Sequence, residues 1–272
     1  MKKKLLTASV LVLCAVALVV GSVFATVAYL TASSGVSNVF TVGNVGITMY
    51  ETKVNPDGTA VNPAATTDTN SYHLVPDTTY IKDPTIQITS LLKNDEMYLF
   101  VKSSNQIRKA EAGNAAGATE QTPKTMRQQM HDNGWVEFVR SQDGVEIVWV
   151  YGTRDEATGV IIPTAVNPTS QQFENADAGK FVLCKTFTIA KDAKVDLYGA
   201  ASVNFTAFAI QTSGVTFEDN TQNNTVKTAW EAVKATYPYA CGIVNPVNPY
   251  DGTQDPYAPI LGVEKPEEIP LA

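Results

Sequence analysis

Histidine and cysteine are scarce in this sequence: its 272 residues include two histidines and three cysteines. A common zinc protease needs a His-Glu-x-x-His helix, and neither His73 nor His131 has a second histidine or a glutamate at helical spacing. The chain also lacks a Gly-x-Ser-x-Gly elbow, a Walker loop and a Gly-x-Gly-x-x-Gly loop. We therefore expect no catalytic residue, no cofactor and no metal ion, and we interpret both histidines as ordinary surface or turn residues.

Charge is sparse and mostly negative. Charged residues make up 17% of the chain, the net charge is -7 and the pI is about 4.9. An acidic surface repels phosphate backbones, so we exclude nucleic acid as a partner. Apolar residues make up 44% of the chain, which is enough for a packed core.

One long apolar run is present, and it is N-terminal. Three lysines at positions 2–4 precede the apolar stretch Leu5–Phe24, and small residues follow at Ala25 and Ala28. This order predicts a secretory signal peptide over residues 1–28, with cleavage after either Ala25 or Ala28. An uncleaved N-terminal anchor is the alternative, because about 20 apolar residues are enough to cross a bilayer. No later segment is apolar enough to do so, and we expect contact with the membrane only during export.

Short strands separated by turns dominate the rest of the sequence and predict one domain over residues 29–244. Val45, Ile47 and Met49 alternate with small or polar residues, which is the period of a half-buried strand. The predicted strands are Val36–Glu51, Thr85–Leu91, Met97–Lys102, Trp135–Arg140, Glu146–Tyr151, Phe181–Ile189 and Ala201–Gln211. The pattern predicts an all-β fold, a jelly-roll-like β-sandwich with long loops and one or two short helices.

The helices and loops are predicted from equally local signals. Helices are expected over Met126–Met130, within a long polar loop at 107–132, and over Val226–Val233, where apolar residues recur at i, i+3, i+4 and i+7. Asn55–Thr59 is predicted to be a turn and Thr66–Ser71 a polar loop. A Pro-rich acidic tail over 245–272 is expected to be a flexible end.

Two cysteines, Cys184 and Cys241, fall within the predicted domain. In an exported protein such a pair can form a disulfide bond. Two buried thiols are the alternative, and the sequence does not decide between them.

Three segments share features with one family of proteins. The signal peptide runs into Asn38–Ile47, which has an Asn-x-Phe-x-x-Gly junction, and Tyr72–Pro76 is followed by a Lys-Asp pair within Tyr80–Ile86. Phe205–Gln211, with Ala229-Trp230 after it, looks like a terminal strand and helix. The chain therefore resembles the TasA/camelysin family of exported, fibre-forming matrix proteins. It departs from the family at Asp77, where glycine is usual, although aspartate tolerates turn conformations.

The resemblance implies a secreted jelly-roll subunit, matured by a SipW-like signal peptidase, that polymerises by donating its freed N-terminal strand to the next copy. Its partners would be copies of itself or related matrix subunits, in the extracellular matrix or at the cell surface. The candidate donor segment begins at Tyr29, and its candidate residues are Tyr29, Leu30, Val36, Phe40 and Val42. The alternative is that this segment forms the first strand of its own sheet.

Two other functions remain open. A non-polymerising surface adhesion module would share the fold and could use exposed aromatic residues, for which the candidates are Tyr237, Tyr239, Tyr250 and Tyr257. A camelysin-type metallopeptidase is less favoured, because the two histidines lack the spacing of zinc ligands.

Overall fold

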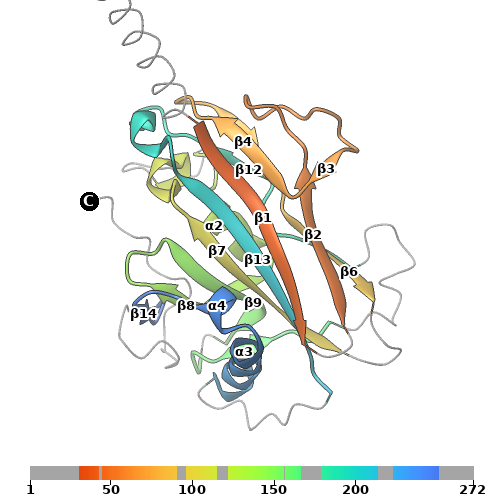
Figure 1. The fold of residues 1–272 in the computed structure, drawn as a ribbon. Helices are drawn as coiled ribbons and strands as arrows, with labels where there is room; N and C mark the ends of the chain where they lie inside the picture. The colour runs from red at the N-terminus through yellow and green to blue at the C-terminus, as the bar shows by residue number, and fades with distance from the viewer. Residues whose placement is uncertain are drawn as a thin grey trace, which may run out of the picture.

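The computed structural model describes residues 31–42, 45–90, 96–114, 122–155, 157–166, 179–213 and 223–250, and within 31–42 it describes the backbone alone. Strands in mostly antiparallel sheets make up most of the regular structure, with few helices, so the predicted all-β class is confirmed (Figure 1). Among the described helices, none is long and apolar enough to cross a bilayer. The predicted signal peptide, residues 1–28, lies outside the described residues.

The larger sheet forms the centre of the fold, in the strand order β14-β8-β9-β7-β13-β1-β4, with β10 paired to β9. Its strands are β1 (Thr31–Val42), β4 (Thr69–His73), β7 (Met97–Asn105), β8 (Trp135–Ser141), β9 (Glu146–Arg154), β10 (Ile161–Pro163), β13 (Ser202–Gln211) and β14 (Pro246–Val247). Every described pair in this sheet is antiparallel except β1 with β13, which is parallel.

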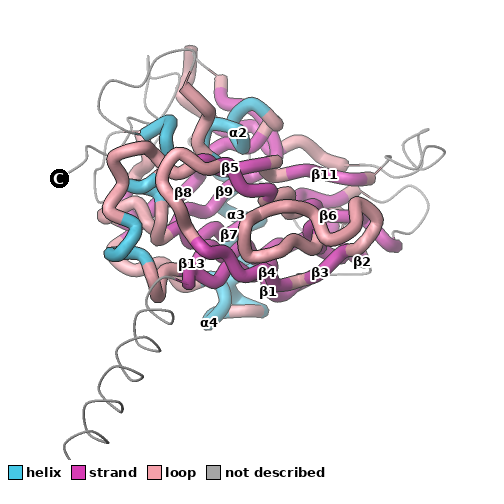
Figure 2. Tube along the Cα trace, turned by 90° about the horizontal axis from the view of Figure 1, so that it is seen from above, coloured by secondary structure: helices cyan, strands magenta, loops and turns pink. Residues whose placement is uncertain are grey.

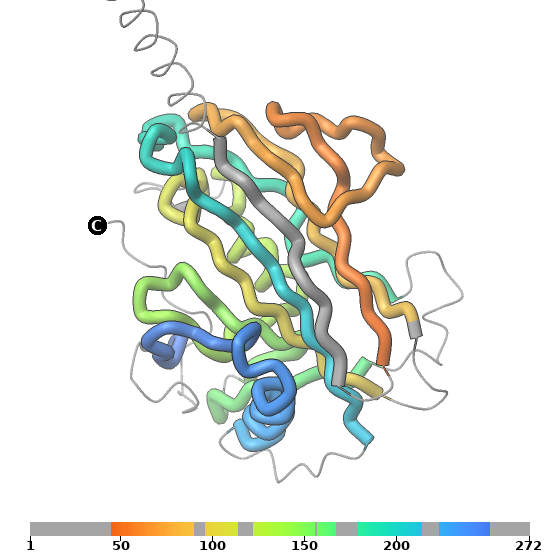
Figure 3. Tube along the Cα trace, viewed as in Figure 1, coloured from red at the N-terminus to blue at the C-terminus, as the bar shows by residue number. Residues whose placement is uncertain are grey.

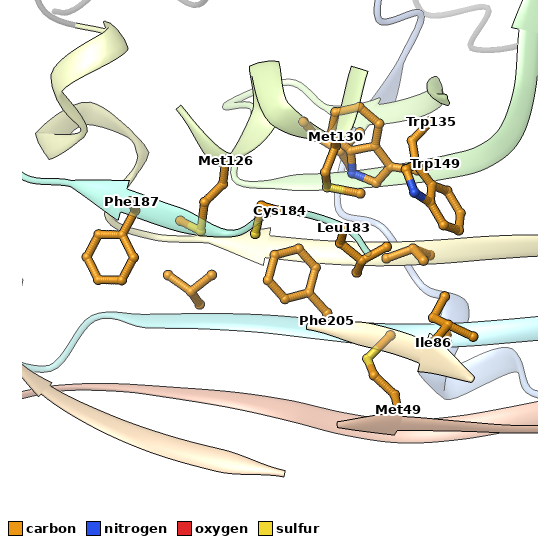
Figure 4. Close-up of a cluster of buried hydrophobic side chains, with 14 of the residues drawn as sticks. Met49, Ile86, Met126, Met130, Trp135, Trp149, Leu183, Cys184, Phe187 and Phe205 are labelled. Carbon is orange, nitrogen blue, oxygen red and sulfur yellow. The ribbon is translucent and has the colours of Figure 1, made fainter. Parts of the chain in front are cut away.

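A smaller sheet packs against one face of the larger one. It has the order β11-β6-β2-β3, and β12 pairs separately with β5. The strands are β2 (Gly46–Thr52), β3 (Thr66–Thr67), β5 (Thr79–Ile81), β6 (Thr85–Ser90), β11 (Lys180–Val182) and β12 (Thr186–Thr188). The main hydrophobic cluster lies between the sheets, where Met49 and Ile86 approach Phe205 and Trp149 (Figure 4). Alternating side chains make this possible, since each strand turns its apolar residues inward.

Two helices cover the opposite face of the larger sheet. They are α3 (Asn224–Thr236) and α4 (Pro238–Cys241), which lie together near one end of β13 (Figure 3). The ring centroid of Trp230 is 5.3 Å from that of Phe100 and 5.5 Å from that of Phe208. The predicted apolar stripe is therefore confirmed and buried; it consists of Val226, Ala229, Trp230 and Val233. Both faces of the sheet are covered, and α2 (Met126–Asp132) lies on the opposite side from α4 (Figure 2).

Three sequence predictions about strands need correction. The single strand predicted over Val36–Glu51 is two strands in different sheets, β1 and β2. The strand predicted over Phe181–Ile189 is likewise divided into β11 and β12. The predicted polar loop Thr66–Ser71 is wrong, because it contains β3 and the start of β4. Asn70 and Tyr72 of β4 point inward, and the polar side chain of Asn70 hides the alternation.

The predicted turn at Asn55–Thr59 is confirmed. In the turn Asn55–Thr59, the Thr59 backbone N–H donates to Asp57 Oδ1 at 2.9 Å, and Gly58 has a φ of 81°. A Cβ at Gly58 would lie 2.5 Å from the ring of Tyr80, so both backbone and space require glycine. Asp77 adopts a φ of 58°, the left-handed region in which glycine is most at ease and aspartate is tolerated.

The stretch predicted as a long loop is more ordered than expected. It contains the short 3₁₀ helices Arg108–Ala110 and Ala112–Asn114 before α2, and Ile107 and Ala110 are buried. The side chain of Thr125 caps α2 by accepting from the Gln128 backbone N–H. Residues 115–121 lie outside the described part.

The domain does not end at residue 244 as predicted. β14 pairs with Arg140 and Ser141 of β8, and Tyr250 is only 7% exposed. The Tyr250 hydroxyl donates to the backbone carbonyl of Glu137 at 3.2 Å. The start of the predicted flexible tail is therefore part of the packed domain, and residues 251–272 lie outside the described part.

Candidate functional site: the N-terminal strand and its groove

β1 lies inside the larger sheet, between β13 and β4 (Figure 1). Thr31–Gly35 pair with β4 in antiparallel register, and the stretch Ser33–Val42 pairs with β13 in parallel register. The register with β13 shifts between Val36 and Val39. Within the described residues, the part of β1 beyond Gly35 is paired on the β13 side alone. β1 also contacts β2 and α3.

Three of the candidate donor residues lie in β1, opposite buried residues of β13. Val36 is in register with Phe205, Phe40 with Phe208 and Val42 with Ile210, and all three β13 residues are buried. Tyr29 and Leu30 lie outside the described residues, as do the predicted cleavage residues Ala25 and Ala28. In the structure, β1 pairs with strands of its own chain, which is the alternative that the sequence left open.

β4 depends on β1 for its place in the sheet. Among the described strands it pairs with β1 alone, so it would be unpaired if β1 left. Side chains attach β4 to the smaller sheet instead: the Tyr72 hydroxyl donates to the Ile81 carbonyl at 2.8 Å. The Asn70 side chain accepts from the Val54 N–H at 2.9 Å and donates to the Thr52 carbonyl at 2.8 Å. The groove that β1 fills is therefore bounded by β13 on one side and by an anchored β4 on the other.

The Lys-Asp pair of the family resemblance joins β2 to the connection between β5 and β6. Lys82 Nζ lies 2.7 Å from Glu51 Oε2, and both side chains are fully buried. Asp83 accepts from the backbone N–H of Thr52 at 2.8 Å and from its hydroxyl at 2.6 Å. Burial raises the pKa of Glu51, although Lys82 opposes the shift. Sequence reasoning missed Glu51, yet it continues the inward series of Ile47 and Met49, where a carboxylate requires a partner.

A second buried carboxylate lies between α2 and β8. Arg127 Nε is 2.5 Å from Glu137 Oε1, and His131 Nε2 is 3.1 Å from the same oxygen. Burial alone would raise the pKa of Glu137, but the adjacent Arg127 and His131 outweigh it and lower the pKa to about 2. His131 also packs edge-on against Trp149, with ring centroids 5.1 Å apart. The prediction that His131 is an ordinary surface or turn residue is therefore wrong.

His73 has a different environment from His131. It is exposed at the end of β4, where its backbone N–H donates to the Pro56 carbonyl at 2.7 Å. In the described part of the chain, no three His, Cys, Asp or Glu side chains are grouped so that they could hold a metal ion. The Glu137 cluster consists of one carboxylate, one guanidinium group and one imidazole. It attaches α2, which carries Arg127 and His131, to β8, which carries Glu137.

The two cysteines lie on opposite faces of the larger sheet. Cys184 belongs to the cluster between the sheets and donates to the Lys82 carbonyl at 3.3 Å, whereas Cys241 belongs to the cluster under α3. Both are free and buried, so the structure has two buried thiols and no disulfide bond between Cys184 and Cys241. Burial raises the pKa of both thiols, that of Cys241 to about 11.

The aromatic residues considered for an adhesive surface do not form one exposed group. Tyr239 is 99% exposed, whereas Tyr250 is buried and Tyr237 packs partly against the cluster under α3. Tyr257 lies outside the described residues.

Comparisons of the chain with protein-family models, with curated proteins and with solved structures found no match. Function is therefore inferred from the residues and contacts of the chain itself.

Proposed function

We propose that this chain is a secreted structural subunit of an extracellular biofilm-matrix or surface fibre, which polymerises by donating β1 to the next copy. The observation that carries the proposal is the position of β1. It is N-terminal in the domain, it lies between β13 and β4, and it is the parallel member of an otherwise antiparallel described sheet. A terminal strand can leave a sheet without drawing another element with it.

Exchange between identical copies preserves the strand pairing, because the β1 that arrives from another copy makes the same pairs as the β1 that left. The N–H and C=O groups of β13 and β4 are then satisfied again by strand addition. Only the three positions 43–45 separate β1 from β2 in sequence, so a donated β1 stays close to the copy from which it comes. Parallel pairing is also slightly less stable per residue than antiparallel pairing, which favours departure of this strand.

The remaining features of the proposal concern export. The N-terminal lysines, apolar run and small residues support a signal peptide removed by a SipW-like signal peptidase. Cleavage would free the start of the donor segment, so the precursor could not polymerise before export. We propose a jelly-roll-like arrangement, with copies of this chain or related matrix subunits as partners, no nucleic acid and no enzymatic activity. Chelator-sensitive cleavage of casein by the pure protein would instead favour the camelysin-type metallopeptidase.

A pair of cysteines tests the exchange directly. Ser33 of β1 and Ser71 of β4 are in register, so a disulfide between Ser33→Cys and Ser71→Cys reports which chain supplies β1. Exchange predicts a ladder of covalent oligomers on a non-reducing gel of assembled protein. The single variants control for Cys184 and Cys241, which are buried. A cross-linked monomer alone, under conditions in which wild-type protein was tested for filaments, would exclude exchange.

Removal of the strand gives a second test. A variant without Thr31–Val42 should form no filaments by electron microscopy, and a synthetic peptide of that sequence should bind it and restore its thermal stability. A scrambled peptide is the control. Filaments from the shortened variant would place the assembly surface elsewhere.

The second candidate is a non-polymerising surface adhesion module. The pairing of β1 within its own chain favours it, and so does the fully exposed ring of Tyr239. A folded monomer in light scattering, for both the full-length and the shortened protein, would exclude polymerisation and favour this alternative.

A further inference from the structure

Three reactive polar side chains meet inside the hydrophobic core, where β2, β4 and the β5–β6 connection come together. Glu51, Lys82 and Asn70 are 0%, 1% and 4% exposed, respectively. Lys82 Nζ contacts Glu51 Oε2 at 2.7 Å and lies 5.7 Å from the ring centroid of Phe205. The Asn70 amide is close enough to Glu51 to lower the pKa of its carboxyl group. A primary amine, a carboxamide and a carboxyl group are thus enclosed together by apolar and aromatic side chains.

The carboxamide of Asn70 is held in a fixed orientation. The Val54 backbone N–H donates to Asn70 Oδ1 at 2.9 Å, and Asn70 Nδ2 donates to the Thr52 carbonyl at 2.8 Å. A backbone N–H aimed at a carbonyl oxygen stabilises the negative charge that develops there when a nucleophile attacks. The other carboxylate of this region, Asp83, is occupied by the N–H and hydroxyl of Thr52. Glu51 is therefore the carboxylate available to Lys82, and its Oε1 accepts no hydrogen bond of normal geometry.

We propose that Lys82 and Asn70 are joined by an intramolecular amide bond that forms spontaneously in the folded protein, with Glu51 as the proton carrier. The Glu51 carboxylate takes a proton from the Lys82 ammonium group. The neutral amine attacks Asn70 Cγ, the Nζ–Cγ bond forms, and the Val54 N–H stabilises the oxygen. The Cγ–Nδ2 bond then breaks and Nδ2 leaves as ammonia. Of the two protons that Lys82 loses, one leaves with ammonia and the other remains on Glu51, so atoms and charge balance without another reactant.

The environment favours each part of this reaction. Burial disfavours the separated charges of the ion pair relative to a neutral amine and a neutral acid. Burial also raises the pKa of Glu51, which suits a group that ends the reaction protonated. Positioning of the amine and the carboxamide in one buried cluster replaces a slow bimolecular step by a unimolecular one.

The bond would give β4 an anchor that does not depend on its neighbour in the sheet. β4 pairs with β1 alone among the described strands, and Asn70 belongs to β4 whereas Lys82 follows β5. A covalent link between them would hold β4 in place whether or not β1 is present. The inference stands without the fibre function, since it rests on the geometry of these three side chains.

Mass spectrometry tests the bond. The purified full chain should have an intact mass about 17 Da below that of its sequence, since ammonia is lost. A proteolytic digest should contain one species that joins the peptides of Asn70 and Lys82. Lys82→Arg, which keeps the charge but lacks the amine, and Glu51→Gln, which cannot carry the proton, should both have their full sequence mass.

The wild-type mass decides the question even if a variant does not fold. Folded wild-type protein with its full sequence mass would overturn the proposal, and so would an ammonia loss that the digest places at another residue. Retention of the mass loss in a folded Glu51→Gln variant would overturn the role of Glu51. Circular dichroism of each variant shows whether it is folded.

Discussion

Glu51 and Glu137 are equally buried, but their surroundings shift their pKa values in opposite directions. Both side chains have 0% exposure. Burial dominates at Glu51, where Lys82 and the Asn70 amide oppose it but the pKa is still raised. At Glu137 burial acts in the same sense, but Arg127 and His131 outweigh it and the pKa falls to about 2. The comparison shows that the number and geometry of the partners, more than depth, decide whether a buried carboxyl group stays ionised.

The difference separates a structural ion cluster from a reactive one. Glu137 remains a carboxylate, and it fixes α2 to β8 through two hydrogen bonds from Arg127 and a contact with His131. Glu51 sits where its protonation is favoured, beside an amine and a carboxamide. The Glu137 cluster lies at β8, which is far from β1 in the strand order. The Glu51 cluster lies next to β4, which borders the position of β1.

The largest effect is expected from Lys82→Met. This change leaves the Glu51 carboxyl group buried without the Lys82 cation beside it, which costs about 3–5 kcal/mol in the free energy of unfolding, and it also removes the proposed amide bond to Asn70. Urea unfolding of the variant and of the wild type, followed by fluorescence at pH 7, measures the difference. A loss below about 1 kcal/mol would mean that Glu51 does not need its partner.

The double variant Glu51→Leu with Lys82→Met is the matched control. Replacement of both members of a buried ion pair by apolar groups of similar size is often neutral or stabilising. We therefore expect the double variant to be more stable than Lys82→Met by most of that cost of about 3–5 kcal/mol. Because neither variant can form the amide bond to Asn70, their difference reports the unpaired carboxyl group alone.

Glu137→Gln should produce a loss that depends on pH. The pKa of Glu137 is about 2 in the folded protein and 4.5 ordinarily, so its ionised form contributes about 3 kcal/mol of stability above pH 4.5. This contribution disappears as the pH falls from 4.5 through 2, because the wild-type carboxylate becomes protonated. The difference in unfolding free energy between wild type and variant should therefore be large at pH 6 and small at pH 2.

Glu231→Gln provides the surface control for that measurement. Glu231 pairs with Lys234 on the exposed side of α3, and such pairs contribute about 0.5 kcal/mol or less. Its difference from wild type should be small at every pH. A Glu137→Gln difference that stayed constant between pH 6 and pH 2 would contradict the lowered pKa.

Local sequence patterns predicted those parts of the fold that local contacts determine. The apolar stripe of Val226–Val233 and the turn at Asn55–Thr59 needed no distant partner to be recognised. β4 was not predicted because Asn70, which points inward, is polar. Asn70 can be buried because its side chain forms hydrogen bonds with the backbone of Thr52 and Val54, which lie elsewhere in the sequence. The division of Val36–Glu51 into two strands was also missed, since both halves alternate and only the pairing partners differ.

The two carboxylate clusters show why the candidate site was harder to predict. Lys82 and Glu51 are 31 positions apart in sequence, and no spacing rule connects them. His131 and Glu137 are near in sequence but not at helical spacing. They meet because Gly134, with a φ of 84°, reverses the chain between α2 and β8. The pairing of β1 with β13 likewise depends on the order of the whole sheet.

A smaller effect is expected from Arg127→Lys. Arg127 donates from Nε at 2.5 Å and from a terminal nitrogen at 3.1 Å to the two oxygens of Glu137. Lysine keeps the charge but cannot make this two-point contact, so we expect a loss of about 2 kcal/mol in the free energy of unfolding. The acid transition attributed to Glu137 should also move to higher pH. Unchanged stability would show that charge alone holds the carboxylate.

Within the Glu137 cluster, His131→Phe should have the smallest effect, about 1 kcal/mol. Phenylalanine keeps the edge contact with Trp149 and removes only the 3.1 Å contact to Glu137, while Arg127 stays in place. Urea unfolding at pH 7, in parallel with Arg127→Lys, ranks the two partners. If the histidine variant lost as much stability as the arginine variant, the ionised state of Glu137 would depend on both partners equally. The difference between the pKa values of Glu137 and Glu51 would then be due to the presence of His131 as well as Arg127, and not to the two-point contact of the arginine alone.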